Sequence, residues 1–200
     1  MLKSLIEKNR SYRRFHQEHN IPFESLKELI NLARLSPSGG NLQPLKFFIS
    51  NTPEKNKLIF PHLKWAGYLK GWNGPEEGER PSAYIIILGN LNYKKVIEYD
   101  VGIAAQSILL GAVEKGLGGC IIGSIQRNEL HKILNLPDNF RILLIIALGN
   151  PKEKVIIEPV KENNIEYWRD SNGIHHVPKR SLDELIINII NLGTVFKKHI

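Results

Sequence analysis

The segment Ser36-Pro37-Ser38-Gly39-Gly40-Asn41-Leu42-Gln43-Pro44 is a dense run of turn-forming residues. Before it, apolar residues from Phe23 to Ala33 recur at helical spacing and predict a helix that begins near Pro22. After it, 45–50 reads as a strand. Glycines here would let the backbone approach a ligand closely, although an ordinary helix-to-strand loop would have the same composition. The segment is neither a P-loop nor a Rossmann fingerprint, because GxxxxGK[ST] and a GxGxxG after a strand are both missing.

On either side of this loop, the hydrophobic pattern predicts a mixed α+β domain with a central sheet. The helix expected over 97–115 is apolar on most sides, which is typical of a buried helix. Ser181 and Glu184 form a capping box that opens a predicted amphipathic helix. Its apolar face would carry Leu182, Leu185, Ile186, Ile189 and Ile190. The other predicted strands are 83–88, 120–122 and 141–148, and the other predicted helices are the first residues to about Lys8, one after Thr52 and 126–135.

Composition limits the classes of protein that the chain can belong to. With 200 residues, 42% of them hydrophobic, it can bury one core, and we expect a single domain over 1–200. The single cysteine excludes an intrachain disulfide and a zinc site built on cysteine pairs. The longest apolar runs fall well short of the roughly 20 residues that span a bilayer, and the charged N-terminus does not resemble a signal peptide. We therefore expect a cytoplasmic protein that does not associate with a membrane.

Basic residues gather at two places where an anion could bind. Arg10, Ser11, Arg13 and Arg14 offer a hydroxyl and planar forks of donors that suit a phosphate. Lys179-Arg180 precedes the capping box, at the positive end of the predicted helix. The formal charge of +7 also favours anionic partners, although solvated surface residues would account equally well for the charge and for both basic segments.

In chain order, these segments resemble the nitroreductase (flavin reductase-like) family. The specific matches are the stretch from Ala33 to Phe47, which contains S-P-S-x-x-N-x-Q-P, and the stretch from Asp100 to Gly118, which contains D-x-G-x-A-x-Q and ends in G-L-G. Ile122-Gly123, 147–151 and Lys179-Arg180 complete a likeness that covers nearly the whole chain.

The resemblance implies an α+β sandwich with a central, mainly antiparallel sheet flanked by helices. It also implies an intertwined homodimer with FMN at the subunit interface, where a partner helix would bury the free face of 97–115. The cofactor-binding residues that it implies are Arg10, Ser11, Tyr12, Arg13, Pro37, Ser38, Gly39, Asn41, Ile122, Gly123, Lys179 and Arg180. Among these, 37–41 would contact the flavin from the other subunit.

The function implied is an FMN-dependent oxidoreductase that moves electrons from NADH or NADPH to a nitroaromatic, a quinone or a flavin in a ping-pong hydride mechanism. No side chain needs to act as nucleophile, acid or metal ligand, because the flavin carries the chemistry. Arg13 is the candidate for stabilising negative charge on the reduced ring. His175-His176 is interpreted as an ordinary loop pair and Cys120 as a core residue.

Other functions stay open on the sequence alone. The same scaffold could serve dehalogenation or enone reduction, or the protein could bind FMN without catalysis. Nucleic acid is not an expected partner, because no helix-turn-helix, RNP motif or zinc finger is present. The chain departs from the family at Asn9, where many relatives have a base, and at Leu45, where tryptophan is usual. Neither the physiological acceptor nor the nicotinamide preference follows from the sequence, and the role of Trp65 to Pro81 is not transferable.

Overall fold

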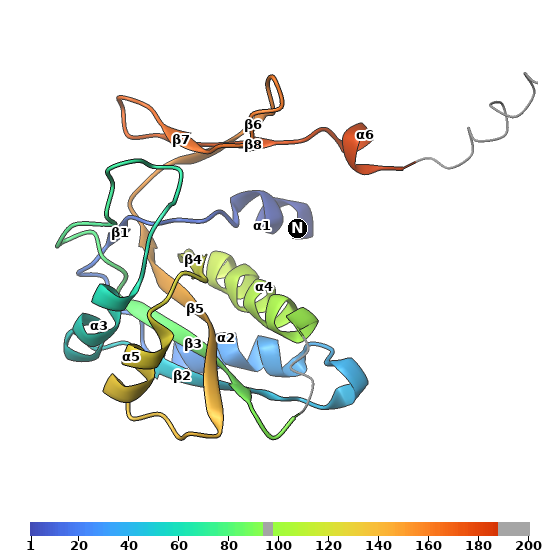
Figure 1. Ribbon diagram of the computed structural model, residues 1–200. Helices are drawn as coiled ribbons and strands as arrows, with labels where there is room; N and C mark the ends of the chain where they lie inside the picture. The colour runs from blue at the N-terminus through green and yellow to red at the C-terminus, as the bar shows by residue number, and fades with distance from the viewer. Residues whose placement is uncertain (94–97, 188–200) are drawn as a thin grey trace, which may run out of the picture. The chain divides into compact units, whose positions relative to one another are not determined.

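The computed structural model describes residues 1–93 and 98–187, which divide into two compact units, Met1–Lys154 and Val155 onward. The first unit is built on a five-stranded sheet (Figure 1). Its strands are β1 (Phe15–His16), β2 (Leu45–Ser50), β3 (Ala83–Asn90), β4 (Gly118–Ile122) and β5 (Phe140–Pro151). The long strand β5 pairs antiparallel with β3 on one side and with β4 and then β1 along the other, while β2 pairs antiparallel with β3.

Helices cover both faces of this sheet, as Figure 1 shows. One face packs against α2 (Phe23–Leu35) and α4 (Glu98–Glu114), and the other against α3 (Pro53–Ile59) and α5 (Arg127–Ile133). Successive side chains of a strand point to opposite faces. Ile85 and Ile87 of β3 therefore enter the first core, and Tyr84 and Ile86 enter the second. A sheet covered on both faces explains why β3 is a continuous apolar run rather than an alternating one.

The ends of the helices follow local chemistry. Thr52 caps α3 by accepting a hydrogen bond from the Lys55 N–H, and Pro53 takes the first helical position, where a missing N–H has no cost. After α4, Gly116 adopts a φ of +73°, the left-handed conformation that commonly terminates helices. The remaining helical elements of this unit are α1 (Leu2–Lys8) and the short 3₁₀ turns η1 (Gly39–Asn41) and η2 (Phe60–His62).

The second unit contains a small three-stranded sheet that the sequence did not predict. Its strands are β6 (Val155–Pro159), β7 (Trp168–Arg169) and β8 (His175–Lys179), with β8 in the middle, parallel to β6 and antiparallel to β7. Helix α6 (Leu182–Leu185) follows.

Two predictions in this region are corrected. The capping box is present, but Ile186 is already in extended conformation, so the amphipathic helix ends after one turn. Ile189 and Ile190 lie outside the described residues. The pair His175-His176 is not a loop but the start of β8, buried, with the His176 ring hydrogen-bonded to Glu158 and, at 3.4 Å, to Asp170. These partners come from other elements, which sequence spacing could not reveal.

The predicted α+β class with a mainly antiparallel sheet is confirmed in the first unit. The strand predicted at 45–50 has those bounds, and the helix expected over 97–115 is α4, whose first predicted residue lies outside the described part. Within residues 1–93 and 98–187, no helix has both the length and the hydropathy needed to cross a bilayer. The prediction of one domain over 1–200 stays a prediction.

Candidate functional site

The basic segment from Arg10 to Arg14 links α1 to β1 and runs along the first residues of β4. Ser11 forms a parallel bridge with Gly119, and the Tyr12 N–H donates to the Gly119 carbonyl at 3.0 Å. The donors predicted for a phosphate are therefore fixed to the central sheet by backbone hydrogen bonds. They do not sit on a free surface turn, as the alternative interpretation supposed.

Two glycines at the start of β4 allow close packing around this segment. A Cβ at Gly118 would lie 2.5 Å from a Tyr12 ring carbon, and a Cβ at Gly119 would lie 2.6 Å from the Ala147 carbonyl oxygen. Real Cβ atoms do not tolerate such distances, so glycine is required at Gly118 for the close approach of Tyr12 and at Gly119 for the packing of β4 against β5. The Tyr12 side chain itself serves the packing, because its ring contacts Gly118 and its hydroxyl donates to the Lys8 carbonyl at 3.1 Å.

Two glutamates also hold the basic segment through hydrogen bonds. Glu153 accepts hydrogen bonds from the backbone N–H groups of Arg13 and Arg14. Glu79 binds the Arg14 guanidinium through both carboxylate oxygens, at 2.5 and 2.6 Å, and contacts Lys152 at 3.1 Å. The hydrogen bond from Arg14 lowers the pKa of Glu79 to about 2 and raises the pKa of Arg14. Sequence reasoning missed both glutamates, which lie far away in the chain, and Arg14 is engaged by Glu79.

Arg10 and Arg13 are left as the cations that could meet a ligand. Arg10 donates through Nη2 to the Ile6 carbonyl at 2.5 Å, whereas its buried Nε has no hydrogen-bond partner among the described residues. Arg13 is buried, and its Nη1 donates to the Ser11 carbonyl at 3.1 Å.

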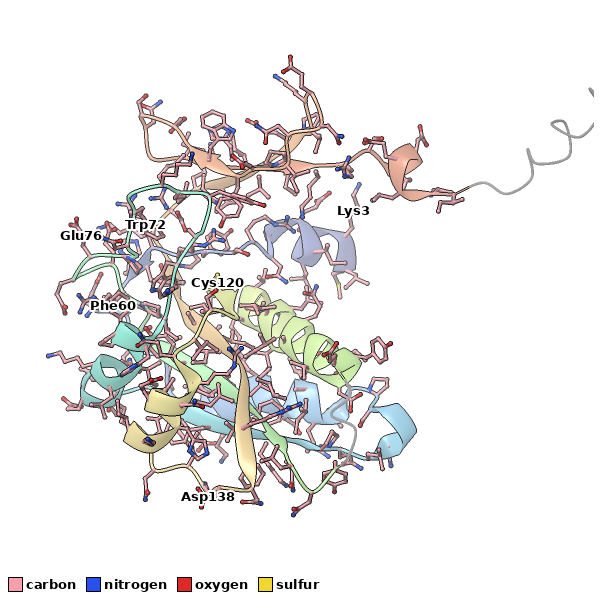
Figure 2. The ribbon with its side chains drawn as sticks, in the orientation of Figure 1. Lys3, Phe60, Trp72, Glu76, Cys120 and Asp138 are labelled. Atoms are coloured by element: carbon pink, nitrogen blue, oxygen red, sulfur yellow. The ribbon has the colours of Figure 1, made fainter. Side chains whose placement is uncertain are left out.

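Two residues that the sequence singled out, Cys120 and Ile122, lie in strand β4, and Gly123 follows it directly. Cys120, labelled in Figure 2, is buried, which confirms its core placement. Burial raises the pKa of its thiol, against the opposing charge of Arg13, so the thiol is poorly suited to act as a nucleophile. Ile122 ends the strand, about 10 Å from Gly119 at the usual rise per residue, and Gly123 comes directly after it. The Gly123 carbonyl accepts a hydrogen bond from Arg127 Nη2 at 2.9 Å.

The glycine-bearing loop is anchored to the beginning of α4 by a buried carboxylate. Asp100 accepts hydrogen bonds from the Ser38 hydroxyl at 2.6 Å and from the Gly39 N–H at 2.9 Å. Asn41 has a φ of +54°, a left-handed conformation that asparagine tolerates better than most residues. Pro37 and Asn41 are exposed, and Pro37 lines a cavity of about 430 Å³ whose other walls come from α2, β2 and α4. The sequence motif contains Asp100 but does not indicate this anchoring role, for which the available signal is an acidic residue in the first turn of an apolar helix.

Helix α4 connects the loop with the basic segment. Six residues after Asp100, the Gln106 side chain accepts a hydrogen bond from Asn9 Nδ2 at 3.3 Å. At 1.5 Å per residue, these two anchor points are about 9 Å apart along one helix. Between them, Gly102 and Ile103 are exposed on α4.

The last predicted pair, Lys179 and Arg180, belongs to the second unit. Lys179 ends β8, and Arg180 lies between β8 and α6. The Arg180 guanidinium donates to the Asn163 side-chain carbonyl at 2.7 Å and to Glu184 at 3.5 Å.

The mainly antiparallel sheet between two helical layers is the arrangement that the family resemblance implied, whereas the attachment of the cationic segment to β4 was not predicted. The chain belongs to the nitroreductase family, whose sequence profile matches residues 6–72 and 78–150. An FMN-dependent nitroreductase from Clostridium difficile has the same fold, with a TM-score of 0.63 at 24% identity, over 77% of this chain and 89% of that one.

Two relatives extend the comparison beyond the fold. The chain is 26% identical to a candidate NADH dehydrogenase/NAD(P)H nitroreductase of Archaeoglobus fulgidus over 150 residues, covering 70% of this chain and 80% of the relative. It is also 26% identical to an iodotyrosine deiodinase of Thermotoga neapolitana over 186 residues, covering 84% of this chain and 97% of the relative.

Proposed function

We propose that this protein is an FMN-dependent oxidoreductase that transfers electrons from NADH or NADPH to a small acceptor. The observation that carries the proposal is the basic segment, which is fixed on β4 with an unpartnered buried donor, in a chain that belongs to the nitroreductase family. The nitroreductase relative of Archaeoglobus fulgidus and the FMN-dependent protein that shares the fold support the same assignment.

The residues of the segment fit the anionic part of FMN. The Arg10 Nε is buried without a partner in the described part of the chain, and such a donor is costly unless a ligand satisfies it. Ser11 adds an exposed hydroxyl, and Arg13 adds a positive charge inside a buried setting, where electrostatic effects are stronger than in water. Arg10, Ser11 and Arg13 would hold the phosphate, the ribityl chain and the pyrimidine edge of FMN, as the family motif implies.

Arg13 would place its charge beside the pyrimidine half of the ring. When bound, FMN supplies the redox chemistry, taking a hydride from the nicotinamide and passing electrons to the acceptor in a ping-pong order. The protein supplies position and charge: Glu153 fixes the backbone of Arg13, and the guanidinium stabilises negative charge that develops in the reaction. Ile122 and Gly123 would approach the ring through their backbone.

The site would be completed by a second copy of the chain. Pro37, Ser38, Gly39 and Asn41 would reach the flavin from the partner subunit, held in shape by Asp100. The exposed residues Gly102 and Ile103 on α4 offer an apolar, small-residue face for that partner. Lys179 and Arg180 would close on the phosphate. We expect a homodimer in the cytoplasm, with no role for nucleic acid or membrane.

Reductive dehalogenation is the second candidate function, because the deiodinase of Thermotoga neapolitana matches most of both chains. It would use the same flavin and the same residues, so the acceptor alone separates the two functions.

The decisive experiment is the absorption spectrum of the purified protein, recorded alone and after addition of FMN. Flavin bands that bleach under anaerobic conditions with NADH or NADPH, and return with a nitroaromatic or a quinone, are the expected result. Return only with an iodinated phenol would favour dehalogenation, and bound flavin that neither nucleotide bleaches would identify an FMN-binding protein without this activity. A colourless protein that takes up no FMN would refute the proposal.

A further inference from the structure

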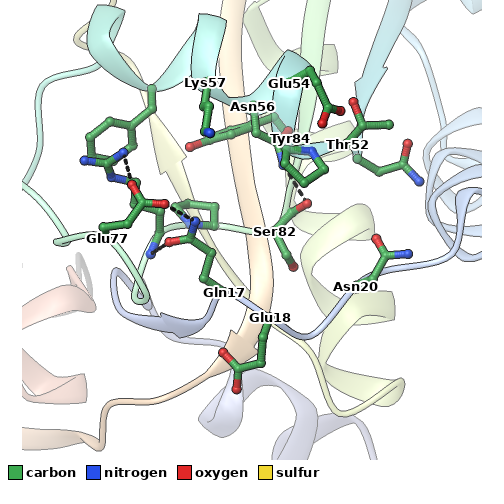
Figure 3. Close-up of a pocket in the computed structure, with 15 residues that line it drawn as sticks. Gln17, Glu18, Asn20, Thr52, Glu54, Asn56, Lys57, Glu77, Ser82 and Tyr84 are labelled. Carbon is green, nitrogen blue, oxygen red and sulfur yellow. Dashed lines mark hydrogen bonds and ion pairs between the residues drawn. The ribbon is translucent and has the colours of Figure 1, made fainter.

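A cavity of about 530 Å³ lies in the first unit, and neither β4 nor the loop anchored at Asp100 contributes to its lining (Figure 3). Its walls come from the stretch after β1, the start of α3 and the polar loop that leads into β3. The volume falls in the range of about 300–1,000 Å³ that is usual for small-molecule sites. None of the predicted flavin residues lines it.

Two buried hydroxyls of this cavity lack a partner. Tyr84 is 0% exposed and Ser82 is 7% exposed, and neither hydroxyl has a hydrogen-bond partner among the residues that the structure describes. Burial raises the pKa of Tyr84, although Arg80 nearby opposes this, so the phenol keeps its proton and can donate. Buried polar groups are normally satisfied, and each exception calls for an explanation.

Two amide side chains of the wall are already engaged in hydrogen bonds within the protein. Asn56 accepts from Ser50 at 2.7 Å and donates to the Ser82 carbonyl at 2.7 Å. Gln17 donates to Glu77 and accepts from the backbone N–H groups of Gly78 and Arg80. Among the described residues, the buried polar atoms of this wall that lack a hydrogen-bond partner are the two hydroxyls and the Nε of Arg80, and a ligand could satisfy them.

Charge and shape define the ligand further. Arg80 is paired with Glu77 at 2.6 Å, and its guanidinium lies 4.3 Å from the centre of the Phe60 ring. Lys57 is the second cation of the lining, against the carboxylates of Glu18, Glu54 and Glu77. Carboxylates in excess disfavour an anion, while Phe60 and the two proline rings of the lining offer apolar contact.

We propose that this cavity is a second ligand site, which binds an uncharged ring compound whose oxygen atoms accept hydrogen bonds from the Ser82 and Tyr84 hydroxyls. The site is separate from the proposed flavin chemistry and does not depend on it.

The test uses 4-hydroxyacetophenone as the probe, titrated by calorimetry into the full-length protein supplied with FMN. Tyr84→Phe should weaken binding about three- to tenfold, since it removes one hydrogen bond and keeps the ring. Ser82→Ala should act in the same direction. Tyr93→Phe, a tyrosine change outside the cavity, is the matched control and should leave the affinity unchanged.

Two further measurements make the test selective. The anionic analogue 4-hydroxybenzoate should bind at least fivefold more weakly than the probe, because the carboxylates repel it. Tyr84→Phe should leave the melting temperature of the ligand-free protein unchanged or slightly higher, because the lost hydroxyl has no internal partner. Failure of the probe to bind at millimolar concentration, or binding that perturbs the flavin spectrum and ignores Tyr84→Phe, would overturn the proposal. A clear fall in melting temperature on Tyr84→Phe would do so as well.

Discussion

Replacing Asp100 tests how the glycine-bearing loop is held. Its carboxylate is 4% exposed and accepts hydrogen bonds from the Ser38 hydroxyl and the Gly39 N–H, at 2.6 and 2.9 Å. A hydrogen bond to a charged group contributes about 1.5–3 kcal/mol. Asp100→Asn keeps one acceptor oxygen but loses the charge, so we expect the free energy of unfolding to fall by about 2 kcal/mol. Asp100→Ala removes both acceptors and should cost about 3 kcal/mol or more.

The assay is urea denaturation of the FMN-free protein, with the slope compared between variants to confirm that the transition is unchanged in kind. Asp138→Asn, an exposed aspartate labelled in Figure 2, is the control and should change stability by less than about 0.5 kcal/mol. A double-mutant cycle with Ser38→Ala should give a coupling energy of about 1–2 kcal/mol, because the two side chains share one hydrogen bond.

The affinity for FMN is a second measurement, which distinguishes an effect on the loop from an effect on the whole fold. If residues 37–41 contact FMN as proposed, Asp100→Asn should raise the dissociation constant of FMN by about tenfold or more, whereas the control should leave it unchanged. An Asp100→Asn protein as stable as the wild type, with no coupling to Ser38, would refute the idea that this carboxylate holds the loop.

Three further predictions concern the basic segment. Arg13→Ala should lower the turnover number on the order of 10²-fold with FMN bound, measured by NADH or NADPH oxidation at saturating acceptor; a loss of only tens of percent would contradict its electrostatic role. Glu79→Gln should destabilise the protein by about 1–2 kcal/mol at pH 7, since it breaks the pair with Arg14. The folded pKa of Glu79 is about 2, below its ordinary value, so the stability difference between wild type and variant is present above about pH 4.5 and fades as the pH falls toward 2. Denaturation curves that show a constant difference across this window would contradict the role of the ionised Glu79 carboxylate. Gly119→Ala should cost about 1–3 kcal/mol in thermal or urea unfolding, because its Cβ would meet a carbonyl oxygen at 2.6 Å, whereas Gly67→Ala, which has open space, should be nearly neutral.

Much of the fold could be predicted because local chemistry and the hydrophobic pattern agree in the first unit. The run at 83–88 is apolar without alternation, and both of its faces are covered in the structure. The second unit was predicted poorly. Its strands β7 and β8 have two and five residues, too short for a periodic signal, and the capping box at Ser181 starts a helix that its sequence does not sustain within the described residues.

In the candidate site, too, some features could be predicted from the sequence and others could not. The sequence by itself determined which groups are available: the guanidiniums of 10–14, the glycines of 118–119 and the turn formers of 36–44. Only the tertiary structure decided their partners, because Glu79, Asp100 and Glu153 are separated by about 60 to 140 residues from the groups that they bind. The local sequence around a carboxylate does not indicate which cation or amide the carboxylate will bind. That choice is made by the pairing of β5 with β1, β3 and β4 for the two glutamates, and by the packing of α4 beside α2 for Asp100.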